Sequence, residues 1–323
     1  MPASTAPATV RLHGWSITTA VPVIAAPSDG PPDIIMRLET TEVLDGSRLV
    51  GESVLDQRPT WDSRLVRVPD GFRYRVDDDY EVSISPAVDD LTIRFGRGRR
   101  LESLALVFTG GVVAIASTLR GRSCLHASSV AIDGRAVAII GPVGAGKTTT
   151  AGLLVAAGAA LIGDDVLAPV VSNGALVAPR GPLELRFRES ARALALSIPA
   201  SAVRTTVDGR TGIVPVNIAM HDCTPLSCFL LPRLVDGPAG VTVREVSRTE
   251  AFGHLTASPR LEGWRDGAIV EQEFDLAARL ANGVPMFEVT IAGLDSLSLV
   301  SADRLRAAIE PCLGSGISSA RAS

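Results

Sequence analysis

Lysine is nearly absent from this sequence of 323 residues, which contains 30 arginines and a single lysine, Lys147. A general preference for arginine indicates a compositional bias of the source genome. Against that bias the one lysine is informative, because arginine has been used wherever a guanidinium could serve. Lys147 therefore marks a position that needs a compact ammonium on a flexible stem.

Cysteine is scarce as well, and the net charge is small. The cysteines are scattered and form no C-x-x-C pair, so the sequence predicts neither a zinc site nor a disulfide framework. The formal net charge of -4 gives no overall electrostatic attraction to nucleic acid or to an anionic membrane. We therefore expect no nucleic-acid partner and no membrane partner.

Long apolar runs are also missing. The most apolar stretch, Leu104 to Ser117, is about 14 residues long and contains Gly110-Gly111, whereas a membrane-spanning helix needs about 20. The first residues lack the basic-then-apolar order of a secretory signal. With 46% hydrophobic residues the chain can build a sizeable core. We expect a soluble, cytoplasmic protein in which this stretch is a buried helix.

The chain is long enough for roughly two domains. Residues 1–100 contain short alternating apolar runs separated by turn residues, which predicts a small β-rich domain. Residues 101–121 have helical apolar spacing and are predicted to link the two parts. Residues 122–313 mix strands and helices, which indicates an α/β (α+β) domain with a mixed sheet. The small, polar residues 314–323 are expected to form a disordered tail.

The first motif with a chemical role in the second domain is a glycine-rich loop. The apolar run Ala136 to Ile140 predicts a buried strand, and Thr148 to Ala157 predicts a helix that Gly158 ends. Between them stands the pattern G-x-x-x-x-G-K-[ST] of a phosphate-binding P-loop, in the strand-to-helix setting that its mechanism requires. The predicted nucleotide-binding residues here are Gly141, Pro142, Val143, Gly144, Ala145, Gly146, Lys147, Thr148 and Thr149.

An acidic pair follows one helix and one strand later. Asp164 and Asp165 end the apolar strand Ala159 to Gly163, which returns the chain to the sheet edge where ligands of α/β folds bind. Because successive strand residues point in opposite directions, the two carboxylates cannot do the same job. One can hold Mg²⁺ while the other faces an incoming hydroxyl as a general base.

The residues from Leu125 to Gly134, the P-loop and the segment Leu161 to Val166 together resemble the catalytic domain of HPr kinase/phosphorylase. The strong match covers residues 122–190. The resemblance implies a fold similar to phosphoenolpyruvate carboxykinase. A looser match, which includes the β-rich N-terminal part, is to compact bacterial HPr-kinase-like serine kinases, some of which act in peptide natural-product pathways such as those of lasso peptides.

The same resemblance implies roles for individual residues. His126 would lie near the transferred phosphate, Asp164 would be the base, and Asp165 would be a metal ligand beside Thr148. Glu184 and Arg186 resemble the start of a glutamate-isoleucine-arginine-glycine signature, in which the glutamate assists the metal and the arginine binds phosphate or carboxylate. Phe187 replaces the glycine of that signature here. Arg204 and Arg210 are only candidates for the mobile phosphorolysis loop of the sensor enzymes.

These observations favour a kinase that uses ATP and Mg²⁺ to phosphorylate a hydroxyl, with a serine of a peptide or small protein as acceptor. Catalysis would depend on Asp164, His126 and Lys147, and the metal on Thr148, Asp165 and Glu184. Two alternatives stay open: a small-molecule kinase on the same scaffold, and a nucleotide-gated binding protein without transfer. A homo-oligomer is possible.

Overall fold

The computed structural model describes residues 6–42, 44, 49–57, 63–76, 79–97, 101–293 and 299–314. The chain divides into unit 1 (Met1–Cys124 with Leu261–Glu273) and unit 2 (Leu125–Arg260 with Phe274–Ser323). The predicted boundary near residue 122 is close to this division. However, the helix expected to link the domains belongs to unit 1, as does the later segment 261–273. The fold class is mixed α/β with three sheets among the described residues.

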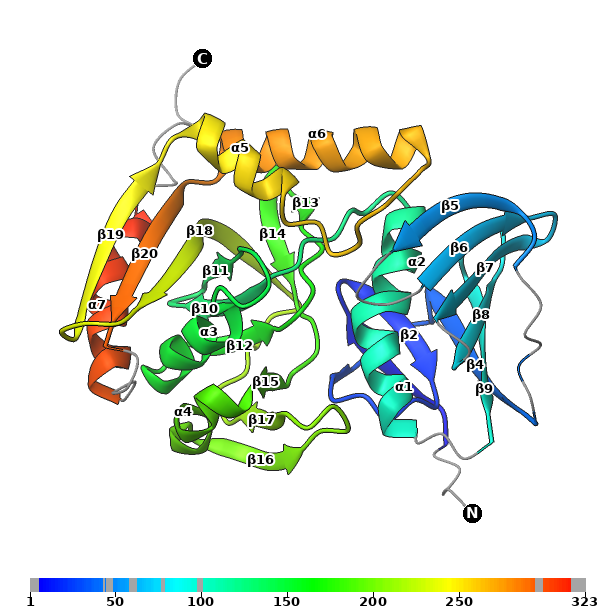
Figure 1. Ribbon diagram of the computed structural model, residues 1–323, viewed down its shortest axis with the longest axis horizontal. Coiled ribbons are helices and arrows are strands. Elements are labelled where there is room, and N and C mark those ends of the chain that lie inside the picture. The colour runs from blue at the N-terminus through cyan, green and yellow to red at the C-terminus, as the bar shows by residue number, and fades with distance from the viewer. Residues whose placement is uncertain are drawn as a thin grey trace. The chain divides into compact units, whose positions relative to one another are not determined.

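Unit 1 is built on a nine-stranded sheet in the order β3-β1-β2-β4-β9-β8-β7-β6-β5 (Figure 1). Its strands are β1 (Ala8–Leu12), β2 (Trp15–Thr19), β3 (Ala26–Pro27), β4 (Ile34–Thr41), β5 (Glu52–Gln57), β6 (Ser63–Val68), β7 (Gly71–Val76), β8 (Tyr80–Ile84) and β9 (Asp90–Gly96). The sheet is mixed, because β4 pairs in parallel with both β2 and β9 while the other pairs are antiparallel. Strands β7, β8 and β9 alternate buried and partly exposed residues, as one-sided packing requires.

The helical segment of unit 1 is continuous from Leu101 to Leu119. Helix α1 (Leu101–Val107) passes through a π-helical turn at Phe108–Val112 into α2 (Val113–Leu119), and the wider turn contains the two glycines. Trp15 of β2 donates a hydrogen bond from Nε1 to Ser117 Oγ at 3.0 Å, which ties the helix to the sheet. Among the described residues this helix alone is long and apolar enough to cross a membrane. Because 61% of its apolar window is buried, the finding is weak evidence for a span.

Unit 2 contains an eight-stranded sheet that branches at its longest strand, β18 (Cys223–Val235). One path runs β12-β10-β11-β18-β14-β13, and β20 joins β18 in parallel and carries β19 at its other edge. The remaining strands are β10 (Ser128–Ile132), β11 (Arg135–Ile139), β12 (Ala160–Gly163), β13 (Val170–Ser172), β14 (Ala175–Pro179), β19 (Gly240–Val246) and β20 (Met286–Ala292). The mixed sheet of the prediction is therefore present.

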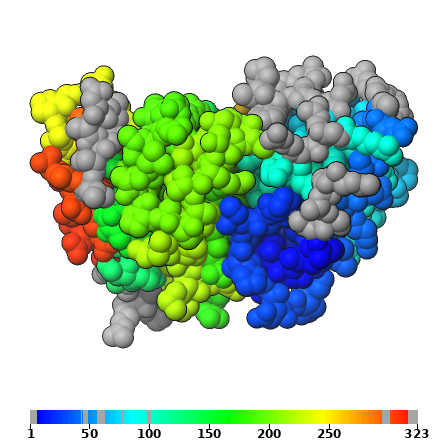
Figure 2. All heavy atoms as spheres, turned by 90° about the horizontal axis from the view of Figure 1, so that it is seen from below, coloured from blue at the N-terminus to red at the C-terminus, as the bar shows by residue number. Residues whose placement is uncertain are grey.

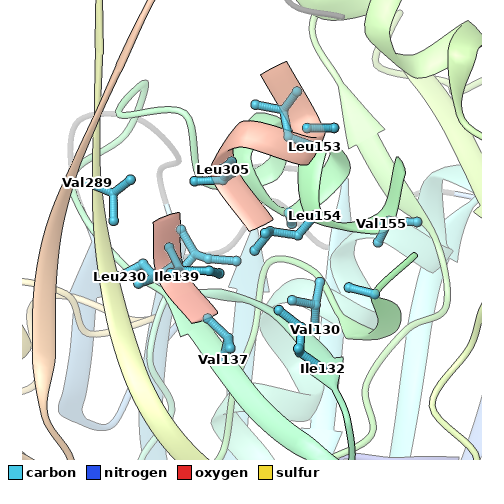
Figure 3. Packing of buried hydrophobic residues seen from close by; sticks show 14 of the residues in the cluster. Val130, Ile132, Val137, Ile139, Leu153, Leu154, Val155, Leu230, Val289 and Leu305 are labelled. Carbon is cyan, nitrogen blue, oxygen red and sulfur yellow. The ribbon is translucent and has the colours of Figure 1, made fainter. Parts of the chain in front are cut away.

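Two apolar cores cover the two faces of this sheet. The first joins α3 (Lys147–Ala156) and α7 (Leu299–Gly314) to residues such as Val137 and Ile139 of β11 (Figure 3). The second joins α5 (Arg248–Thr256) and the part of α6 (Gly267–Gly283) that belongs to unit 2 to Ala136 and Ala138 of the same strand. Alternate residues of β11 thus pack against a helical layer on each face of the sheet. This packing places the start of α3 at the end of β11.

A small third sheet, β15-β17-β16, lies beside the helix that follows the loop. It consists of β15 (Leu185–Phe187), β16 (Ala200–Thr205) and β17 (Thr211–Pro215), with α4 (Arg192–Ser197) between the first two. Most residues of β16 are exposed, and its region of the chain, yellow-green in Figure 2, lies at the surface. The ring of Phe187 packs directly against Gly152 of α3, where an added Cβ would lie 2.6 Å from the ring. This contact brings β15 alongside the loop helix.

Candidate functional site

The loop between β11 and α3 is shaped by three glycines. Ile140 is still joined to β18, since its N–H donates to Leu230 O at 3.0 Å. The backbone then takes positive φ at Gly141 (140°), Gly144 (88°) and Gly146 (94°), conformations that residues with a Cβ rarely adopt. The turns of this loop therefore favour glycine at these three positions, which include both glycines of the G-x-x-x-x-G-K-T pattern.

The loop ends in a group of unsatisfied backbone donors. In the part of the chain that the structure describes, the N–H groups of Gly146, Lys147, Thr148 and Thr149 have no hydrogen-bond acceptor. Gly146 is the N-cap of α3 and offers no side chain to satisfy them. Free amides at a helix N-terminus, together with the helix dipole, are well suited to bind phosphate. The predicted loop thus fits the phosphates of a nucleotide.

Lys147 is buried at the mouth of this loop. Its Nζ donates to the carbonyl oxygens of Gly141 at 2.7 Å and Pro142 at 3.1 Å. Burial lowers the pKa of Lys147 to about 8, against the opposing effect of Asp164 and Asp165. The carbonyl partners of Lys147 are neutral, so they do not cancel its positive charge, which can attract an anionic ligand.

Asp164 lies directly beneath the start of the loop helix. Its Oδ1 accepts from Ser128 Oγ at 2.5 Å, and both carboxylate oxygens lie close to Thr148 Oγ1, at 3.1 and 3.2 Å. The backbone N–H of Arg186 also donates to Asp164, at 3.3 Å. Burial raises the pKa of this carboxyl, while the Ser128 hydrogen bond opposes the shift. A carboxylate beside the hydroxyl that follows the P-loop lysine is a donor set suited to Mg²⁺.

Asp165 faces a different set of partners. Its Oδ2 lies 3.0 Å from Arg260 Nη2 and 3.4 Å from Arg186 Nη2, and its Oδ1 lies 3.4 Å from His126 Nδ1. Its backbone is in the left-handed region, with φ of 75°, and such strain is often found at functional sites. Although burial acts to raise it, the two guanidiniums hold the pKa of Asp165 far below its usual range.

His126 is positioned by neighbours on both sides. Its backbone N–H donates to Ser258 O at 3.0 Å, while Leu125 pairs with Leu167 just after the acidic pair. Burial lowers the pKa of His126 to about 4, and the nearby charge of Asp165 opposes that shift. The imidazole is therefore neutral near pH 7.

The structure brings Asp164, Asp165, His126, Arg186 and the loop together, and it gives the two acids different contacts. The sequence prediction gave the metal to Asp165 and the base to Asp164, and both roles stay predictions. In the structure the carboxylate that contacts Thr148 is Asp164, whereas Asp165 contacts two arginines and His126.

Glu184 is joined to an arginine. It receives two hydrogen bonds from Arg204, at 2.6 and 2.9 Å, and its Oε1 fills the space beside Gly212 of β17. Among the described contacts of Glu184 none is with Thr148, Asp164 or Asp165, so a part in metal binding remains a prediction. Arg210, the other candidate for a mobile arm, pairs with Asp208 at 3.1 Å.

Two residues of the site, Ser128 and Arg260, were not predicted from the sequence. Ser128 stands two residues after His126 on the strand β10, and this spacing could have placed it on the same side of the sheet. Arg260 follows α5 and reaches Asp165 across 95 positions of sequence, which no local pattern reveals. Among the described residues no group of three His, Cys, Asp or Glu side chains is placed to hold a metal. Any ion here would share its shell with phosphate and water, as Mg²⁺ commonly does.

Comparison with solved structures finds a likeness to the HPr(Ser) kinase/phosphatase from Coxiella burnetii. The two chains share 13% sequence identity with a TM-score of 0.29, over 56% of this chain and 93% of that one. No protein-family profile matches the sequence, and no curated protein sequence matches it. The structural likeness is too distant to bear on activity, which we infer from the contacts of the site itself.

Proposed function

We propose that this protein is a Mg-ATP-dependent kinase that transfers the γ-phosphate to a hydroxyl, with a serine of a peptide or small protein as the acceptor. The observation that carries the proposal is the contact between Thr148 and Asp164 beside a loop with unsatisfied amides. A site for phosphate alone would not need a buried carboxylate next to the hydroxyl at the helix start. A site for phosphate with Mg²⁺ does.

The donor groups fall into two sets. The loop amides and Lys147 bind the β- and γ-phosphates, and Thr148 with Asp164 holds Mg²⁺. The ion supplies charge neutralisation for the phosphates when it is bound. Because phosphoryl transfer depends mainly on positioning and electrostatic stabilisation, this inventory is sufficient without a covalent intermediate.

The proton of the acceptor hydroxyl needs a separate partner, and we assign it to His126. Asp165 faces Nδ1, which leaves Nε2 as an acceptor in the neutral ring. The negative charge of a bound triphosphate would raise the pKa of His126 from about 4 toward its usual value. As the acceptor oxygen bonds to the γ-phosphorus and the bond to the β-γ bridging oxygen breaks, the proton passes to Nε2 and ADP leaves.

The test is transfer from γ-labelled ATP, with Mg²⁺, to matched peptides that carry serine or alanine. Label on the serine peptide alone supports the proposal, and label only on small metabolites would favour the small-molecule kinase. Nucleotide binding without any transfer would favour the nucleotide-gated binding protein. His126→Gln should slow transfer on the order of 100-fold or more while ATP binding stays within about twofold, since a base acts on the hydroxyl rather than the nucleotide.

A further inference from the structure

Two arginines, Arg260 and Arg188, lie close enough to Lys147 for their positive charges to add to the effect of burial and lower the pKa of its ammonium. They differ in whether their own charge is balanced. Arg260 is committed to Asp165, at 3.0 Å. Arg188 is exposed and forms no ion pair or side-chain hydrogen bond with any residue that the structure describes. A cation is thus held near the phosphate loop with no protein partner.

The direction of Arg188 follows from the strand before it. Arg188 stands directly after β15 and keeps an extended backbone, with φ of -68° and ψ of 163°. Successive residues of an extended chain alternate in direction. Phe187 points into the core against α3, whereas Arg186 points the other way to Asp165. Arg188 therefore shares the face of Arg186, toward the site.

The charges of the site leave room for an anion at this place. The cations are Lys147, Arg186, Arg188 and Arg260, and the acids are Asp164 and Asp165. Two of the arginines are paired with Asp165, and the amides at the start of α3 have no acceptor among the described residues. An anion bound at the loop beside Lys147 would lie within reach of the unpaired guanidinium of Arg188.

We propose that Arg188 binds the terminal phosphate of a nucleoside triphosphate and so determines the preference of this site for triphosphate over diphosphate. The inference rests on the proposed function. A guanidinium can bind two oxygens of one phosphate in a planar fork. The loop amides and Lys147 would meet the β-phosphate, which both nucleotides carry, as well as the γ-phosphate, whereas Arg188 would meet only the γ-phosphate of the triphosphate.

The experiment measures dissociation constants for Mg-ATP and Mg-ADP by calorimetry in the full-length protein, Arg188→Gln and Arg192→Gln. Arg192 is the matched control, because it is exposed, stands four residues away and pairs with Glu189 at 3.8 Å. We expect Arg188→Gln to weaken ATP binding by roughly 10- to 100-fold, the usual loss for a charged hydrogen bond. ADP binding should change by less than about twofold, and Arg192→Gln should change neither.

Equal losses for ATP and ADP, or no loss for either, would overturn the role of Arg188 while leaving nucleotide binding intact. Failure of the unmodified protein to bind either nucleotide would instead overturn the proposed function, so the two failures can be told apart. Arg188→Lys provides a second variant. It keeps the charge but not the fork, and it should recover only part of the preference for ATP.

Discussion

The sheet of unit 1 and the loop edge of unit 2 use arginine and acidic residues in opposite ways. In unit 1, Arg37 pairs with Asp90 and Arg94 pairs with Glu39 across the neighbouring strands β4 and β9, and all four side chains are well exposed. At the loop edge of unit 2, one carboxylate, Asp165, is in contact with Arg186, Arg260 and His126.

The difference separates charges that serve the fold from charges kept for a ligand. Exposed pairs across strands contribute little free energy and help to specify register. Buried or unbalanced charges are costly, so a fold retains them where a ligand completes the balance. Two groups mark the loop edge as such a place. Lys147 donates its hydrogen bonds to neutral carbonyls, and Arg188 has no side-chain partner among the described residues.

The largest effect on ATP binding at the loop edge is expected from Lys147→Ala. Removal of the ammonium should raise the dissociation constant for Mg-ATP on the order of 100-fold, because a charged hydrogen bond to phosphate is lost. Lys147→Arg keeps the charge but adds bulk in a buried position, and it should still lose at least about tenfold. Calorimetry with both variants checks this, and ATP binding by Lys147→Arg at the unmodified affinity would contradict our explanation of the single lysine.

A smaller but clear effect is expected from Gly146→Ala. The residue has φ of 94°, and a Cβ there would lie 2.5 Å from Leu234 Cδ1 and 2.8 Å from Cγ. The matched control is Gly134→Ala in the β10–β11 turn, where φ is 74° and no atom lies within 4 Å. Both should lose about 1 kcal/mol of unfolding free energy from the backbone. Only Gly146→Ala should also weaken ATP binding, by about tenfold, and equal binding by the two variants would contradict the prediction.

Glu273, in the later segment of unit 1, is a partly buried acid. Burial raises the pKa of Glu273 to about 7, with the Trp264 side chain opposing the shift. Because the folded state holds this proton more tightly than the unfolded chain, stability should fall as pH rises from about 4.5 to about 7. Glu273→Gln should therefore raise the unfolding free energy at pH 8 by about 1–2 kcal/mol. Urea unfolding at pH 4 and at pH 8 checks this. A gain of the same size at pH 4 would show that the effect does not come from the proton bound by Glu273.

The smallest effect is expected from Arg37→Gln in the sheet of unit 1. Its partner Asp90 is also well exposed, so the unfolding free energy should change by less than about 0.5 kcal/mol. ATP affinity should not change. A loss of more than about 2 kcal/mol in chemical denaturation would show that the exposed pairs of unit 1 do more than we infer.

Local patterns predicted what depends on neighbours in sequence. The strand, loop and helix around Lys147 were expected, as was the end of that helix at Gly158, where φ is 92°. The turns at Asp133-Gly134 and Asn173-Gly174 have positive φ at both residues, which these residue types tolerate. The β-rich character of residues 1–100 was expected too. Glycine and asparagine turns have a local cause, and so the sequence reveals them.

Features that depend on distant partners were not predicted. Strand β18 is 13 residues long, because partners on both sides extend it. Strands β16 and β19 were missed, since β16 is largely exposed and β19 is an edge strand. The partners of Asp164 and Asp165 could not be assigned either. Both residues follow the end of β12, and the positive φ of Asp165 turns it toward Arg260.

The most direct test of the account is the effect of Mg²⁺ on ATP binding by the unmodified protein and by Asp164→Asn. We predict that the unmodified protein binds ATP more tightly with Mg²⁺ than without it. Asp164→Asn should keep the affinity for free ATP to within about threefold, lose the gain from Mg²⁺ and lose phosphoryl transfer. No ATP binding by the unmodified protein, or a gain from Mg²⁺ that survives in Asp164→Asn, would contradict the account.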